Sequence, residues 1–196
     1  NHCFEIEDSS FWFNHRNRCI LSALNNYPVD GPFIDVGGGN GFVTAFLDKN
    51  GINAYLLEPG LAGIENAKKR SIGKLIHATF EEAKFHPQSL AGIGLFDVLE
   101  HIEDDMGFLQ SLFNTLTNQG KLFLTVPVYP LLWSDEDRYA GHFRRYSMKK
   151  LSKKLNIVGF RVLYRTYFFS ILPVPVFLFR TLPYRLLRRK YKPKSN

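Results

Sequence analysis

The chain has 196 residues, of which 45% are hydrophobic and 22% are charged, a composition typical of a globular protein with a sizeable core. The net charge of +7 is local, because residues 180–196 hold seven basic side chains and no acid, leaving 18 of each sign elsewhere. A neutral body disfavours a broad nucleic-acid-binding face. Two cysteines are too few for a disulfide framework, and no apolar run reaches the ~20 residues of a membrane span. The low cysteine content predicts a reducing, cytoplasmic setting. The opening NHCFEIEDSSFW shows no secretory signal.

Strand-like and helix-like patterns alternate along the chain. In chain order, we expect a helix at 9–27, a strand at 32–37, a helix at 42–51, a strand at 52–60, a helix at 62–73, strands at 74–80 and 89–97, a helix at 104–120, a strand at 121–129, a helix at 147–160 with Ser147 as its N-cap, and a strand at 161–169. This alternation predicts an α/β fold: a doubly wound, mostly parallel sheet with helices on both faces. Such sheets bind ligands beyond the carboxyl ends of their strands.

The stretch FIDVGGGNGF, residues 33–42, places four glycines between the first expected strand and the next helix. Such a turn lets backbone approach a ligand at a helix N-terminus. The dinucleotide fingerprint G-x-G-x-x-G/A fails in either register, because its third position falls on Phe42 or Thr44. A nicotinamide dehydrogenase is therefore disfavoured, and S-adenosylmethionine, which has no pyrophosphate, is the candidate cofactor. Glu58 ends the second expected strand, where a ribose-binding carboxylate belongs.

The same stretch resembles motif I of class I S-adenosylmethionine-dependent methyltransferases, usually written D-V-G-C-G-T-G, with Gly38 in place of Cys and Asn40 in place of Thr. LLEPG resembles the motif that carries the ribose acid. ATFEEAKF resembles the stretch whose Asp faces adenine, and here Thr79 takes that position. FDVLEHIEDD resembles the segment after the fourth strand.

Residues 120–147 resemble a subgroup of small bacterial methyltransferases, the type 11/type 23-like enzymes, with a W-S-x-x-D…G-H-x-R-R-Y signature. The whole resemblance spans residues 5 to about 168. It implies the Rossmann-like class I methyltransferase fold, methyl transfer from S-adenosylmethionine, and S-adenosylhomocysteine as the product.

Expected cofactor-binding residues follow from these motifs. Asp35 either fixes the glycine loop or contacts the ligand, and Phe80 and Phe96 either contact the cofactor or belong to the core. Arg16, on the first expected helix, is a candidate for the cofactor carboxylate. The full set is Arg16, Asp35, Gly37, Gly38, Gly39, Gly41, Glu58, Thr79, Phe80 and Phe96.

The acceptor side is expected after the fourth and fifth strands. His101 is a candidate general base, or else a hydrogen-bonded residue that opens the next helix, and His142 is the second catalytic candidate. GHFRRY offers donors for a carboxylate, phosphate or sugar, so the expected substrate-binding residues are Trp133, Arg144, Arg145 and Tyr146. Alternatively, the arginines pair with the acids of DEDR, residues 135–138. We expect no metal site, because the His and acidic residues show no fixed ligand spacing.

Residues 1–169 are expected to form the methyltransferase domain and 170–196 an apolar, then basic, tail. The tail either binds an anionic surface on the inner membrane face or docks as a helix on the sheet. The predicted function is methyl transfer to a small-molecule, lipid-linked or sugar-linked acceptor. The alternatives are a non-catalytic S-adenosylmethionine-binding or regulatory protein and an RNA methyltransferase.

Overall fold

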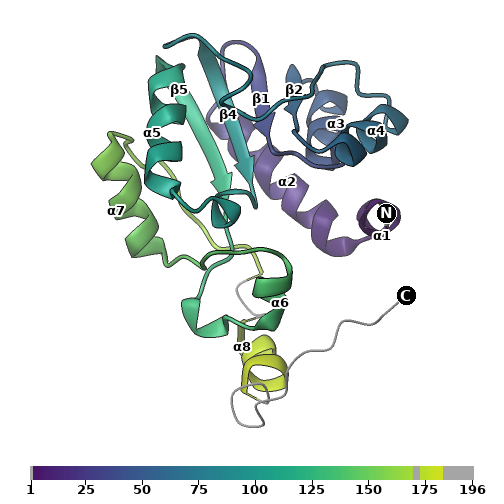
Figure 1. Ribbon diagram of the computed structural model, residues 1–196, viewed down its shortest axis with the longest axis vertical. Helices are drawn as coiled ribbons and strands as arrows, with labels where there is room; N and C mark the ends of the chain where they lie inside the picture. The colour runs from purple at the N-terminus through teal and green to yellow at the C-terminus, as the bar shows by residue number, and fades with distance from the viewer. Residues whose placement is uncertain (1, 170–172, 183–196) are drawn as a thin grey trace. The chain divides into compact units, whose positions relative to one another are not determined.

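A computed structural model of the chain describes residues 2–169 and 173–182 (Figure 1). These residues form two compact units. Unit 1 contains the described residues up to Val98 together with Gln110–Thr125, and unit 2 contains Leu99–Leu109 and the described residues from Val126 onward.

Unit 1 is built on a five-stranded sheet of order β3-β2-β1-β4-β5, in which every pair of neighbours is parallel. Figure 1 shows β2, β1, β4 and β5 side by side. Because β2 and β4 flank β1 on opposite sides, the strand order reverses at β1, which makes its carboxyl end the expected ligand site. The predicted doubly wound parallel sheet is confirmed. The strands are β1 (Phe33–Val36), β2 (Ala54–Leu57), β3 (Leu75–Ile76), β4 (Leu90–Phe96) and β5 (Leu116–Thr125).

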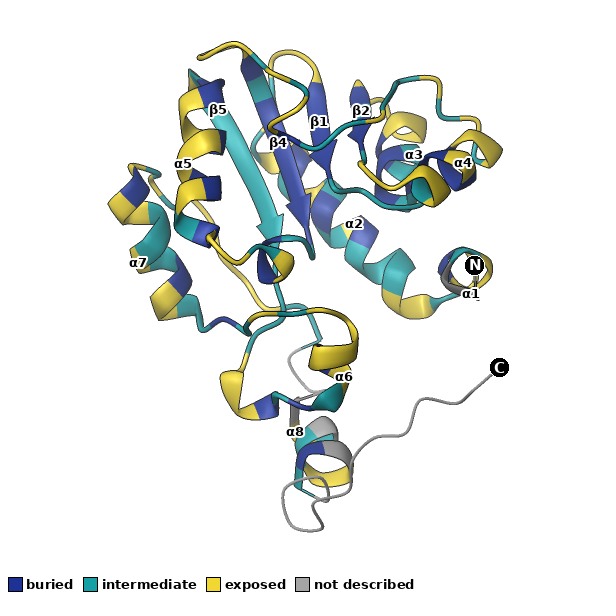
Figure 2. Ribbon diagram, in the orientation of Figure 1, coloured by how far each residue is buried: buried dark blue, intermediate teal, exposed yellow. Residues whose placement is uncertain are grey.

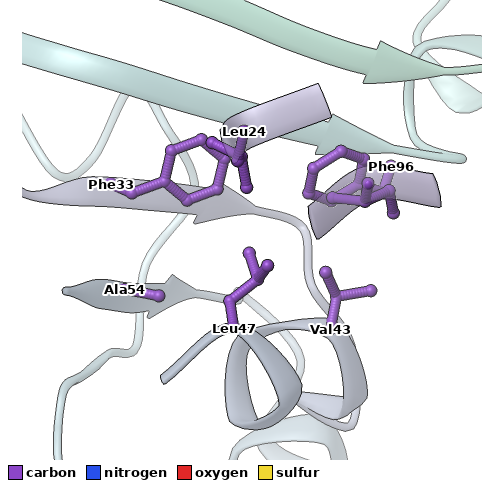
Figure 3. Packing of buried hydrophobic residues seen from close by; sticks show 7 residues of the cluster. Leu24, Phe33, Val43, Leu47, Ala54 and Phe96 are labelled. Carbon is purple, nitrogen blue, oxygen red and sulfur yellow. The ribbon is translucent and has the colours of Figure 1, made fainter. Parts of the chain in front are cut away.

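Helices of unit 1 cover the sheet and bury its central strands. All four residues of β1 and most of β4 are buried (Figure 2), as expected for parallel strands covered on both faces. One apolar cluster joins α2, α3, β1, β2 and β4, and Figure 3 shows its side chains pointing toward one another. Its buried members are Ile20, Leu24, Phe33, Val43, Leu47, Ala54 and Phe96. The helices are α1 (His2–Glu7), α2 (Phe11–Asn26), α3 (Phe42–Lys49), α4 (Leu61–Lys69) and the end of α5 (Asp105–Thr115).

Unit 2 is made of short helices and connecting loops. Ser147 caps α7 as predicted, since its hydroxyl accepts a hydrogen bond from the Lys150 amide, and Gly159 ends the helix with a left-handed φ of 116°. Besides the start of α5, its elements are η1 (Leu99–His101), η2 (Pro130–Leu132), α6 (Asp135–Tyr139), α7 (Met148–Val158), α8 (Pro173–Val176) and the short π-helix η3 (Phe177–Thr181).

The prediction of a strand at 161–169 is wrong. These residues adopt no regular structure, and most of their side chains are exposed. Aromatic side chains of this segment pack in pairs, as in the stack of Tyr167 on Tyr129 at 5.6 Å between ring centroids. The predicted helix at 104–120 is too long, because β5 begins at Leu116.

Part of the predicted tail, residues 170–172 and 183–196, lies outside the described residues. Within the described part of the chain, every helix is too short or too polar to cross a bilayer.

Candidate functional site

The glycine turn follows β1 directly and precedes α3. Gly37, Gly39 and Gly41 have φ angles of 67°, 55° and 73°, in the left-handed region where an L side chain is strained. A Cβ placed on Gly39 would meet no atom within 4 Å, so glycine is needed there for its conformation and not for lack of room. The turn therefore presents bare backbone to open space at the carboxyl end of β1.

Two further glycines are required by close packing. A Cβ on Gly38 would lie 2.6 Å from Oδ2 of Asp35 and would also collide with the side chain of Leu56. A Cβ on Gly63, in α4, would lie 2.8 Å from the carbonyl oxygen of Gly39. Gly63 was not among the predicted site residues, although an isolated glycine inside a helix often has a packing or functional reason.

Glu58, just after β2, links the glycine turn to the neighbouring loop. Its Oε2 accepts a hydrogen bond from the Gly39 amide at 2.9 Å, and its Oε1 accepts one from the Gly60 amide at 2.7 Å. Each carboxylate oxygen has a second lone pair, so Glu58 can hold the turn and still accept hydrogen bonds from a ligand.

Asp35 is a fully buried carboxyl group in β1. Its Oδ2 accepts a hydrogen bond from the Thr44 hydroxyl at 2.7 Å, while its Oδ1 has no hydrogen-bond partner among the described residues. Burial raises the pKa of Asp35 to about 6, against the lowering effect of Thr44 and Arg16. The observed bond joins β1 to α3, so Asp35 braces the strand against the helix that follows the turn.

A polar cluster that the sequence analysis missed lies where β4 and β5 end. Asp97 has a left-handed φ of 57°, which is uncommon for a residue with a side chain. Its carboxylate accepts hydrogen bonds from the Thr125 hydroxyl at 2.8 Å and from Arg16 at 2.5 Å. Arg16, expected to bind the cofactor carboxylate, is thus paired with a protein carboxylate.

The remaining cofactor candidates lie in turns and in the core. Thr79 and Glu82 form a reciprocal turn, in which the Thr79 amide donates to the Glu82 carboxylate at 2.9 Å and the Glu82 amide donates to the Thr79 hydroxyl at 3.1 Å. Phe80 is buried and packs against Phe85. Phe96 is buried in the core cluster, where its ring stacks on Phe33.

In unit 2, Asp137 organises the segment that follows Trp133. The buried Asp137 carboxylate accepts hydrogen bonds from the Ser134 amide at 2.9 Å and from Nε of Arg145 at 2.7 Å. It also pairs with Nδ1 of His142, which lies 3.1 Å from Oδ1 of Asp137. Burial acts to raise the pKa of Asp137, but these bonds outweigh it and hold the pKa below its ordinary value. The ion pair of Arg145 is the alternative that the sequence left open.

Asp105 forms a second buried anion centre. It accepts hydrogen bonds from the Tyr146 hydroxyl at 2.8 Å and from Lys154 at 2.6 Å, and it pairs with Arg144 at 2.9 Å. Arg144 also donates to the carbonyl of Glu103, and Tyr146 is buried. Burial, followed by the bond to Asp105, raises the pKa of Tyr146, so this residue is a neutral donor.

The two predicted catalytic histidines come together. The rings of His101 and His142 lie edge to face, with centroids 4.7 Å apart, and the carbonyl of Glu100 accepts a hydrogen bond from the Phe143 amide at 2.8 Å. His101 is exposed and His142 is half-buried. The sequence placed both residues at the acceptor side, and the fold of unit 2 joins them into one cluster.

A family model described as a methyltransferase domain matches residues 12–165. The chain belongs to this methyltransferase family. The predicted membership of the class I, type 11/type 23-like group is therefore confirmed. Among curated proteins, none matches the sequence significantly.

Solved structures show the same fold at low sequence identity. A methyltransferase from Archaeoglobus fulgidus, described as S-adenosylmethionine-dependent, has 13% identity and a TM-score of 0.61, with 89% of this chain and 93% of that chain covered. A possible histamine N-methyltransferase from Thermotoga maritima has 21% identity and a TM-score of 0.61, with 82% and 81% covered. Phosphoethanolamine N-methyltransferase 2 from Haemonchus contortus, in complex with S-adenosyl-L-methionine, has 16% identity and a TM-score of 0.65, with 87% and 42% covered.

Proposed function

We propose that the chain is an S-adenosylmethionine-dependent methyltransferase acting on a small-molecule, lipid-linked or sugar-linked acceptor, with residues 1–169 as its catalytic domain. The choice of cofactor rests on the position of Glu58 at the carboxyl end of β2, where its carboxylate accepts hydrogen bonds from the amides of Gly39 and Gly60. Its remaining lone pairs suit the two hydroxyls of a ribose.

The glycine turn fits the rest of this cofactor. The open space before Gly39 leaves room for a ligand against bare backbone. The buried Oδ1 of Asp35, which lacks a hydrogen-bond partner among the described residues, is an acceptor suited to a cationic group or a bridging water. Thr79, Phe80 and Phe96 remain candidates for the adenine and methionine ends.

S-adenosylmethionine supplies a methyl group on a sulfonium, and transfer breaks the S–C bond with its electron pair kept by sulfur, while an acceptor lone pair forms the new bond. The chain's own part is to position the two molecules, which accounts for much of the rate in such displacements. If the acceptor must lose a proton, His101 and His142 are the groups suited to activate it. Arg144, Arg145, Tyr146 and Trp133 are the proposed substrate-binding set.

The proposed class of acceptor rests on the net charge of the chain outside its tail and on the names of similar solved structures. Outside residues 180–196 the chain is electrically balanced, which disfavours an RNA acceptor. Two of the similar structures, from Thermotoga maritima and Haemonchus contortus, are named for small amines. Those names support a small-molecule or lipid-headgroup acceptor here.

A thermal-shift titration tests the cofactor. We expect S-adenosylmethionine and S-adenosylhomocysteine to stabilise the protein by about 2.7 kcal/mol at a concentration of 100 times their dissociation constant, with no effect of NAD. Glu58→Ala should abolish the shift, whereas Glu65→Ala, an exposed acid on α4, should keep it. A shift that survives Glu58→Ala would contradict the assigned ribose site. Release of S-adenosylhomocysteine in the presence of lipid extracts or small amines then tests turnover, which a non-catalytic binding protein lacks.

We also propose that the tail contacts an anionic membrane surface. In the described part of the tail, the side chains of Val174, Leu178 and Phe179 are 64%, 48% and 82% exposed, and the basic residues of 183–196 follow in sequence. Exposed apolar groups beside a cationic stretch are typical of an interfacial anchor. The full chain should sediment with vesicles containing phosphatidylserine but not with neutral vesicles. Equal binding after deletion of 183–196 would overturn the proposal.

A further inference from the structure

Within the described part of the chain, Glu100, His101 and His142 bring three metal-ligating atoms within 4.8 Å of one another. Glu100 is buried, His142 is half-buried and His101 is exposed, so the cluster has a protein-facing side and a solvent-facing side. All three residues belong to unit 2. Their sequence spacing gives no ligand motif, because two are adjacent in η1 and the third follows α6.

Backbone contacts hold the two halves of this cluster together. The Phe143 amide, next to His142, donates a hydrogen bond to the Glu100 carbonyl at 2.8 Å. The two imidazole rings pack edge to face, with their centroids 4.7 Å apart, so each ring limits the rotation of the other. The cluster is therefore built by the fold of one unit and does not depend on chance proximity of long side chains.

Asp137 holds the ring of His142 in a fixed orientation, as a metal-binding histidine requires. It faces Nδ1 of His142 at 3.1 Å, which fixes the ring and leaves Nε2 for a metal. Asp137 is itself fixed by the Arg145 guanidinium at 2.7 Å and the Ser134 amide at 2.9 Å. Carboxylate–histidine–metal triads have this arrangement.

We propose that Glu100, His101 and His142 form a binding site for a divalent transition metal, with zinc as the first candidate. Two imidazoles and one carboxylate are a donor set that zinc and other first-row divalent ions accept. Three protein ligands leave at least one coordination position open, and the exposure of His101 gives that position access to solvent.

The role of the metal rests on the proposed methyl transfer. If these three residues held a metal, it would supply Lewis-acid chemistry that makes the proton of an acceptor oxygen or nitrogen more acidic, with solvent as the destination of that proton. A histidine nitrogen that binds a metal cannot also take up the acceptor proton. Metal binding would thus replace base catalysis by His101 and His142 with Lewis-acid activation.

Metal binding is tested directly on untagged full-length protein, without cofactor or acceptor. Zinc is titrated against a fluorescent chelator, and cobalt(II) is titrated by its visible absorption. We expect one equivalent of each metal to bind. His101→Ala, which changes an exposed side chain, should weaken zinc binding by more than about 100-fold, and Asp137→Asn by roughly 10–100-fold, as second-shell changes do.

Two controls make the outcome decisive. His86→Ala removes an exposed histidine outside the cluster and should leave zinc affinity unchanged. The thermal shift given by S-adenosylmethionine should persist in His101→Ala, so that failure of the metal site is distinguished from failure of the cofactor site. Wild-type affinity for zinc in His101→Ala, or equal losses in His101→Ala and His86→Ala, would overturn the proposal.

Discussion

The glycine turn of unit 1 and the histidine cluster of unit 2 are built in opposite ways. Around the turn, the chain provides bare backbone, and the main requirement is the absence of side chains at Gly38, Gly39 and Gly63. In unit 2, the geometry depends on two buried carboxylates, Asp105 and Asp137, which each bind several donors. The first region depends on close packing at Gly38 and Gly63 and on backbone conformation at Gly39. The second depends on buried carboxylates that are paired with donors.

This difference explains what each region can tolerate. A substitution at Gly38 or Gly63 acts through the room that a side chain needs, whereas one at Gly39 acts through the left-handed backbone conformation. A substitution in unit 2 acts through the donors that lose an acceptor, so its effect depends on charge and pH.

Asp137→Ala should have the largest effect. It removes the acceptor of Arg145, Ser134 and His142, and breaking a buried ion pair costs about 3–5 kcal/mol of unfolding free energy. Urea unfolding followed by circular dichroism measures the loss. Glu136→Ala, a change at the exposed neighbouring position, should stay within about 0.5 kcal/mol. A loss in Asp137→Ala as small as that control would show that charge satisfaction does not hold unit 2 together.

Asp35→Asn should stabilise the protein at neutral pH. Burial raises the pKa of Asp35 to about 6. The protonated carboxyl group therefore makes its full contribution to the free energy of unfolding below the ordinary pKa of about 4, and this contribution is lost as the pH rises through 6. We expect the variant to exceed the wild type by roughly 1–3 kcal/mol at pH 7.5 and by much less at pH 4.5. Urea unfolding at the two pH values tests this, and an equal difference at both would show that Asp35 does not titrate as described. Weaker S-adenosylmethionine binding should accompany the gain.

Arg70→Met tests whether α1 secures the glycine turn. Arg70 pairs with Glu7 at 2.9 Å and with Asp8, and its guanidinium lies over the Phe4 ring, while Glu7 also accepts a hydrogen bond from Asn40 of the turn. We expect a loss of about 1–3 kcal/mol of unfolding free energy, because the buried Glu7 loses a charged donor. Limited proteolysis should cut the first eight residues of Arg70→Met sooner than those of Lys68→Met, which changes an exposed lysine of α4, the helix that ends just before Arg70. If Arg70→Met and Lys68→Met were cut at the same rate, the contacts of Arg70 would not be what holds α1 against the glycine turn.

Ser147→Ala should have the smallest effect, near 1 kcal/mol, because it removes the N-cap bond of α7. Ser10 is the matched control: it occupies the N-cap of α2, but its side chain makes no cap hydrogen bond. Thermal unfolding of Ser147→Ala and Ser10→Ala should therefore differ. Equal shifts would show that the cap bond contributes little.

The sequence predicted the parallel sheet and the glycine turn because both depend on local patterns. In a βαβ unit, an apolar run before a glycine turn predicts a buried strand, and an acid at the end of the next strand, such as Glu58, predicts a ribose-binding position. The wrong strand at 161–169 arose because a strand-like composition does not show whether a neighbouring strand is available for pairing. Asp97, Asp105 and Gly63 were missed because their roles depend on partners far along the chain. The histidine candidates were found, but their joining with Glu100 required the fold.

The contact between Gly38 and Leu56 has an evolutionary consequence. The family pattern usually has Cys where this chain has Gly38, and here the side chain of Leu56 fills the volume that such a residue would occupy. A larger residue at position 38 therefore needs room from the Leu56 side chain and a shift of the Asp35 carboxylate as well. Relatives with Cys in the turn are expected to carry a shorter side chain at the matching position of β2, so the two sites should co-vary.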